Sequence, residues 1–115
     1  MALQKTITLP NGAVGNYIQL VTAAADYSAK YVPVEFALFM DAAHAVSNPT
    51  NPLCPLIAKM RLDGAKFDQY ISTVALAAIT ADDPFRASLY AAAKAEPLLA
   101  GGGLTSIDLS DAVSV

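Results

Sequence analysis

The sequence predicts an α+β fold: an antiparallel β-sheet or small sandwich of about five strands, with one C-terminal helix. Two observations lead to this prediction. Apolar and polar residues alternate along several short segments in the first two-thirds of the chain, as in strands with one buried face. The clearest helical pattern, over residues 83–96, comes after these segments and does not alternate with them, which favours α+β over α/β.

Residues 3–9 and 14–24 are predicted to form a β-hairpin. Between them, Pro10-Asn11-Gly12 has turn chemistry, because proline fixes φ while Asn and Gly tolerate a positive φ. One face of the first segment is apolar but interrupted by a lysine, in the order Leu3, Lys5, Ile7 and Leu9. The lysine suits an edge strand near its end.

Residues 31–40 are predicted to form a third strand. Its core-facing set has no polar member and consists of Val32, Val34, Phe36, Leu38 and Met40. Because Pro33 cannot donate to a ladder, the strand should begin there or have an open edge at that point, so it is interpreted as an edge-capable strand. Residues 41–45 suit a helical turn, and residues 47–52 are predicted to be loop.

Residues 56–62 alternate and are predicted to form a fourth strand, which Asp63-Gly64 ends in a turn. The core-facing set of this strand is Leu56, Ala58, Met60 and Leu62. Residues 67–74 fit a fifth strand. The alanine-rich stretch 74–79 fits strand or helix, and its periodicity does not decide between them.

Residues 83–96 are predicted to form the helix. Asp82 or Asp83 can cap its N-terminus, and Pro84 suits the first helical position. Pro97 stops it, because proline cannot continue a helix.

Residues 1–100 are predicted to form a single globular domain, which is a normal length for one domain. Residues 101–115 are predicted to be a Gly-tethered C-terminal tail or arm, since Gly101-Gly102-Gly103 precedes a loosely alternating segment. The sequence leaves open whether this segment pairs with a neighbouring subunit or is a frayed terminus.

The composition argues against nucleic-acid and membrane partners. The net charge is −3, and the seven Lys and Arg residues are never adjacent, so no stripe can neutralise phosphates. Charged residues interrupt the longest apolar stretches before they reach the roughly 18 residues needed to span a bilayer. The N-terminus lacks the apolar region of a signal peptide, so we expect synthesis in the cytoplasm.

The sequence lacks the residue sets of enzymes and metal sites. His44 is the single histidine, and the candidate nucleophiles Ser47 and Cys54 have no recognisable catalytic context. One histidine and one cysteine cannot supply a zinc site, and Cys54 is expected to be a small buried hydrophobe. We therefore predict no enzyme activity, no catalytic, cofactor-binding or metal-binding residues, no cofactor and no small-molecule substrate.

The acidic and glycine-rich segments have structural explanations. Helix capping accounts for Asp82-Asp83, and nothing in the sequence brings Asp41, Asp63 and Asp68 together. Gly101-Gly102-Gly103 follows the predicted helix and does not open one, so it cannot present a helix N-terminus to phosphate.

Two segments, covering about a third of the chain, resemble short tail and baseplate structural proteins of long-tailed bacteriophages. The first reads Lys5-x-Ile7-x-Leu9-x-Asn11-Gly12, followed by Asn16-Tyr17. The second reads Asp83-Pro84, then Leu89-Tyr90-x-x-x-Lys94-x-x-Pro97-x-Leu99-Ala100-Gly101. Leu99 departs from the resemblance where an aromatic residue is usual, and Ala91-Ala92-Ala93 replaces bulkier positions.

The resemblance implies a non-catalytic virion protein in the tail or baseplate, made in the host cytoplasm. Such a protein would multimerise and join larger virion proteins, and the low charged fraction of 15% suits surfaces that partners cover. Two alternatives share the composition: a head-decoration or head–tail connector protein, and a small binding protein directed at the host.

Overall fold

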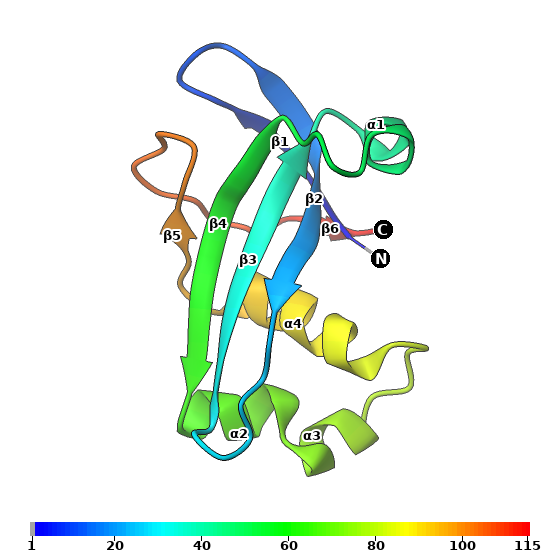
Figure 1. Cartoon of the computed structure of the whole chain (residues 1–115), viewed down its shortest axis with the longest axis vertical. Coiled ribbons are helices and arrows are strands. Elements are labelled where there is room, and N and C mark those ends of the chain that lie inside the picture. The colour runs from blue at the N-terminus through cyan, green and yellow to red at the C-terminus, as the bar shows by residue number, and fades with distance from the viewer. Residues whose placement is uncertain (1) are drawn as a thin grey trace.

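The structure is a computed structural model that describes residues 2–115, and it shows an α+β fold built on one open antiparallel sheet (Figure 1). The sheet has six strands in the order β5-β4-β3-β2-β1-β6. The strands are β1 (Leu3–Thr8), β2 (Val14–Ala23), β3 (Tyr31–Phe39), β4 (Cys54–Asp63), β5 (Leu99–Ala100) and β6 (Val113–Ser114). The helices are α1 (Ala42–Ser47), α2 (Ala65–Ile71), α3 (Thr73–Ala77) and α4 (Pro84–Ala95). The predicted fold class is confirmed, in its single-sheet form.

The predicted hairpin is confirmed. β1 and β2 pair antiparallel, from Leu3 opposite Ile18 to Thr8 opposite Val14. Its turn is closed by the Gly12 N–H, which donates to Leu9 O at 2.9 Å. β1 is not the outermost strand of the sheet, because β6 pairs with it at Leu3 and Gln4.

The third strand is confirmed, but β3 lies in the middle of the sheet between β2 and β4, so its interpretation as an edge-capable strand is wrong. The expected open edge at Pro33 itself is present on the β2 side, because the β2–β3 pairing ends at Val34 and does not reach the proline. Four of the five predicted core residues are buried, whereas Met40 is half exposed because β3 ends at Phe39.

The predicted fourth strand is confirmed as β4, with one change in its core-facing set. The β3–β4 register shifts between the pairs Phe36–Ala58 and Leu38–Cys54. As a result, Ile57 is buried, whereas Leu56 is only partly buried.

The predicted fifth strand over residues 67–74 is wrong, because α2 and α3 occupy this stretch. Phe67 and Ile71 are both buried and stand four residues apart, which is the spacing of one helical face. Ser72 separates the helices with an extended backbone, and its hydroxyl accepts from the Ala75 N–H at 3.2 Å as the N-cap of α3. The sequence left strand or helix open for residues 74–79, and the structure shows helix as far as Ala77.

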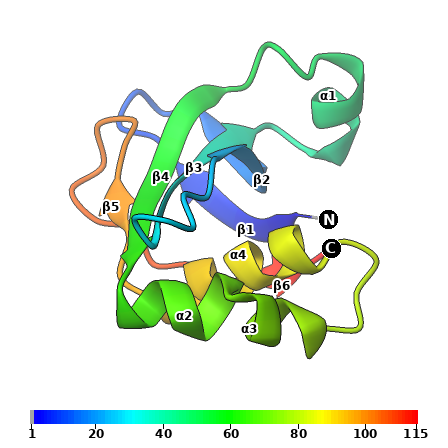
Figure 2. The same cartoon turned by 60° about the horizontal axis from the view of Figure 1, so that its bottom comes forward.

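The predicted helix is confirmed as α4. Asp83 caps it by accepting from the Arg86 N–H at 3.2 Å, and the helix ends at Ala95, two residues before Pro97. Figure 2 shows α2, α3 and α4 together on one face of the sheet, with α1 at the other face. The largest fully buried side chains include Phe36, Phe67, Leu3, Ile18, Ile57 and Leu89.

The C-terminal segment packs on the same core. β5 and β6 lie at opposite edges of the sheet, and the chain between them crosses behind it in the view of Figure 1. Leu109 and Ala112 from this segment are 1% and 3% exposed and belong to the main hydrophobic cluster. The segment 101–115, predicted to be a Gly-tethered tail or arm, is therefore in contact with residues 2–100 of its own chain. Exchange of this segment between subunits stays a prediction.

Tyr90 joins α4 to an irregular point of β2. Its hydroxyl accepts a hydrogen bond from the buried Leu20 N–H at 2.7 Å, next to a shift in the β2–β3 register between Leu20 and Thr22. Burial raises the pKa of the Tyr90 phenol. The neutral phenol is therefore the form that the fold favours.

Tyr90→Phe is expected to lower the free energy of unfolding by about 1–3 kcal/mol, since it leaves the Leu20 N–H without a partner. Urea denaturation would measure this, with Tyr31→Phe, a half-buried tyrosine of β3, as the control. Folding raises the pKa of Tyr90. The contribution of the Tyr90 hydroxyl to stability is therefore complete below the pKa of the unfolded chain, about 10, and is lost as the pH rises through the pKa of the folded chain. The alkaline decline in stability should be shallower in the Phe variant. Equal urea midpoints for wild type and variant would contradict the assignment.

Candidate functional site

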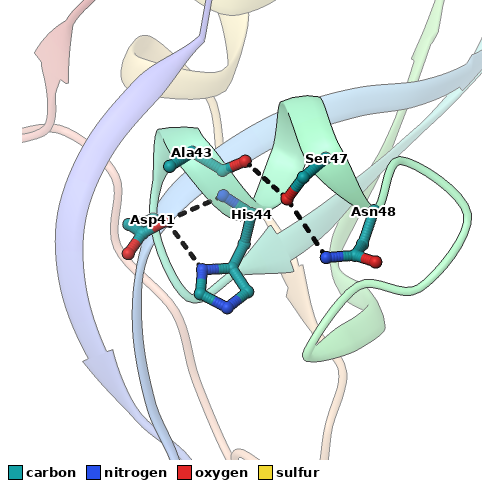
Figure 3. A network of polar contacts seen from close by, with 5 residues as sticks. All are labelled: Asp41, Ala43, His44, Ser47 and Asn48. Carbon is teal, nitrogen blue, oxygen red and sulfur yellow. Dashed lines mark hydrogen bonds and ion pairs between the residues drawn. The ribbon is translucent and has the colours of Figure 1, made fainter.

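The single histidine belongs to a polar network around α1 (Figure 3). Asp41 Oδ1 accepts from the His44 N–H at 2.8 Å and lies 2.9 Å from the His44 ring Nδ1. The backbone hydrogen bond, followed by the ring contact, lowers the pKa of Asp41. Ser47 Oγ donates to Ala43 O at 2.9 Å and accepts from Asn48 Nδ2 at 3.1 Å.

This network forms the two ends of a short helix. Asp41 is the N-cap of α1, and the Asn48 N–H donates to His44 O at 2.8 Å as its C-cap. The Ser47 hydroxyl forms hydrogen bonds with Ala43 and Asn48, whereas the His44 ring contacts Asp41. The histidine is therefore not placed as a general base for the serine, which is the contact that nucleophilic catalysis requires.

The three aspartates considered as a cluster do not meet, because Asp41 lies away from Asp63 and Asp68. Asp63 pairs with Tyr31 at the start of β3, whereas Asp41 lies beyond the end of that strand. Asp63 contacts Arg61 Nε at 3.2 Å, and Asp68 contacts Lys30 Nζ at 3.4 Å. Within residues 2–115, no three His, Cys, Asp or Glu side chains gather in a way that could hold a metal ion.

Cys54 and the glycine run have packing roles. Cys54 is 7% exposed, as predicted for a small buried hydrophobe, and its Sγ lies 3.3 Å from Leu56 O. Gly102 and Gly103 have φ values of +63° and +84° and turn the chain away from β5. A Cβ on Gly102 would lie 2.8 Å from the Cys54 sulfur, so the glycine lets the turn approach β4 closely.

A second feature is the open outer side of β6, which pairs with β1 on its inner side. The sequence points to it only through the loose alternation of the C-terminal segment. Two shallow hollows flank β6. The hollow on the α4 side is lined by Ala2, Ala87, Tyr90, Ala91, Lys94 and Ser114. The hollow on the α1 side is lined by Tyr17, Ala42, Ala43 and Val115, together with the polar Gln4, Asn16 and Asp41. We call residues 113–115 and these two hollows the β6 edge surface.

The two edges of the sheet differ in charge. At the opposite edge, β5 also has no charged residue, and its Leu99 is 63% exposed. β5 pairs only with Ala58 and Lys59, and the part of β4 that it leaves uncovered carries exposed Arg61 and Asp63. At the β6 edge, Val113 and Val115 are 61% and 50% exposed, and no charged residue lies among residues 113–115. Charged side chains on an edge strand discourage pairing with another chain, so the uncovered part of β4 is protected in a way that β6 is not.

Residues 112–115 alternate Ala, Val, Ser, Val, and this short pattern was too weak to identify the edge. A strand of two residues has no periodicity of its own, so only its place in the sheet reveals it.

None of the helices formed by residues 2–115 is long and apolar enough to cross a membrane.

The observations that bear on function are the fold and these surfaces. The chain matches no protein-family model, and no curated protein or solved structure shows significant similarity to it.

Proposed function

We propose that this chain is a non-catalytic structural protein of a bacteriophage virion, a tail or baseplate component. It multimerises and joins larger virion proteins by shape and contact, with copies of itself and other virion proteins as its partners. It is made in the host cytoplasm and takes its place in the tail.

The β6 edge surface is the observation that carries the proposal. It combines an open strand edge without charged side chains, two exposed valines, and two flanking hollows whose linings together include five alanines, with one charged residue in each hollow. An open strand edge is a template for pairing with another chain, and exposed apolar surface marks interaction sites. Subunits of an assembly use such edges as contacts.

The tail or baseplate assignment draws its support from the two sequence segments described above. The first corresponds to the β1–β2 hairpin, and the second runs from the N-cap of α4 through β5 to Gly101. Both segments contribute to the core: Ile7 and Leu9 from the first, and Leu89 and Tyr90 from the second, are buried.

The proposal predicts that purified virions contain this chain at a fixed copy number, in a multiple of three or six. Quantitative mass spectrometry of purified particles would measure it, with a known major tail protein as the internal standard. Separate preparations of heads and tails would then locate the chain, and the proposal expects it in the tail fraction.

Two other results would contradict the tail assignment. Recovery in the head fraction would make the chain a head-decoration or head–tail connector protein. Absence from particles, together with presence in infected cells, would leave a host-directed binding protein as the better account.

A further inference from the structure

The outer side of β6 presents one backbone donor and one backbone acceptor. Val115 exchanges two hydrogen bonds with Ala2, each 3.0 Å long, so its N–H and C=O point toward β1. Polar groups of successive residues point to opposite sides of an antiparallel strand. The N–H and C=O of Ser114 therefore point away from β1, on a side where residues 2–115 place no further strand.

A second copy of the same residue satisfies both groups at once. In an antiparallel pair, two residues that face each other through their outward groups exchange both hydrogen bonds. Ser114 of one copy and Ser114 of another meet this condition about a two-fold axis between them. The contact is isologous, as in the common two-fold dimers, and it needs no other partner.

The same pairing buries the exposed valines. When Ser114 faces Ser114 of the second copy, Val113 of each copy faces Val115 of the other. Val113 pairs with the exposed Gln4, on the face opposite to the buried Leu3, and Val115 lines the hollow on that side next to α1. The four valines of two copies thus meet on one face of a continuous sheet, where cross-strand β-branched pairs are favourable.

The hollows on either side of β6 contain small side chains. On the α4 side, the residues beside Ser114 include Ala87, Ala91 and Ala2, whose small side chains allow close approach. On the other side, Ala42 and Ala43 of α1 do the same. Lys94 and Asp41, the charged residues of the two hollows, border different hollows and so lie on different faces of β6.

We propose that two copies of this chain associate through antiparallel pairing of their β6 strands, centred on Ser114, to form one continuous sheet. The proposal deepens the multimerisation proposed above, and rests on it, by naming the contact. The occupant of the β6 edge surface is a second copy of this chain.

Disulfide trapping tests the register directly. Cα atoms of a hydrogen-bonded antiparallel pair lie about 5.5 Å apart, a separation that a disulfide spans. Ser114→Cys should therefore give a covalent dimer on a non-reducing gel after mild oxidation. Val74→Cys, at an 81% exposed position on α3, is the matched control and should stay at least about tenfold less crosslinked. Cys54 is buried and is present in both variants.

A proline at position 114 tests pairing between two copies without removing a hydrogen bond between β6 and β1 of the same copy. Ser114→Pro removes an N–H that faces away from β1, while Ser114→Ala keeps it. Sedimentation velocity over a concentration series should show a dimer for wild type and for Ser114→Ala. Ser114→Pro should weaken the dimer by about tenfold or more, as should Val113→Lys, whereas Val74→Lys should not. Unchanged circular dichroism would show that each variant is folded.

Three results would overturn the proposal: a wild-type chain that stays monomeric, a dimer that Ser114→Pro and Val113→Lys leave intact, or equal crosslinking at positions 114 and 74. These results are independent of the virion experiment. A chain present in tails but not crosslinked at position 114 would reject only this interface. A chain crosslinked at 114 but absent from particles would reject the virion role and keep the dimer.

Discussion

Leu109→Ala is expected to lower the free energy of unfolding by about 3 kcal/mol, the middle of the range for large-to-small changes in a core. The Leu109 side chain is 1% exposed and belongs to the main hydrophobic cluster, although it lies in the segment beyond the glycine run. Truncation would leave a cavity beneath the sheet that its neighbours cannot easily fill, because core side chains are held by close packing.

Val113→Ala is the matched control, because Val113 is 61% exposed and lies only four residues further along the same segment. It should change the stability of the monomer by no more than about 0.5 kcal/mol. Urea denaturation at a protein concentration low enough to keep the chain monomeric would compare the two. If Leu109→Ala were as mild as Val113→Ala, the C-terminal segment would not be part of the folded core.

The elements that the sequence predicted well are those specified by local chemistry. The hairpin follows from alternation on either side of Pro10-Asn11-Gly12, and α4 follows from Asp83, Pro84 and the stop at Pro97. In each, the residues that determine the element are neighbours in sequence. No knowledge of the tertiary structure is needed to identify them.

The elements that it missed depend on contacts distant in sequence. Phe67 to Val74 suits a strand by composition, but the buried pair Phe67 and Ile71 has helical spacing, and packing against α4 and β4 decides in favour of α2. β5 and β6 contain two residues each, and only their partners β4 and β1 define them as strands. Pro33 by itself suggests an edge strand, because the sequence does not show that the pairing between β2 and β3 ends at the pair Ala23–Val34.

The candidate site was hidden for the same reason. Whether a strand lies at an edge is a property of the sheet order, and β6 becomes an edge only because the chain crosses the sheet between residues 101 and 112. The polar network around His44, in contrast, is local. Asp41 and His44 stand three residues apart, which is the usual spacing between an N-cap residue and the residue whose N–H donates a hydrogen bond to it.

Gly101→Ala is expected to be the other strongly destabilising substitution, with a loss of about 3 kcal/mol or more in the free energy of unfolding. A Cβ at this position would lie 2.1 Å from Leu56 O, a backbone atom of β4 that cannot move without disturbing the sheet. The Gly101 N–H also donates to Ile57 O at 2.9 Å, so the clash would break the bond that holds the turn against β4. The φ of Gly101 lies outside the left-handed region, so the loss is steric.

Gly12→Ala provides the contrast, because Gly12 has a φ of +88° and a Cβ there would meet nothing within 4 Å. It should cost only the backbone strain, about 1–2 kcal/mol. Thermal and urea unfolding would rank the two variants, and equal losses would contradict the close approach of Gly101 to β4. Gly101→Ala combined with Leu109→Ala should destabilise less than the sum of the single changes. Once the turn at Gly101 is displaced, the segment that carries Leu109 has already lost part of its packing.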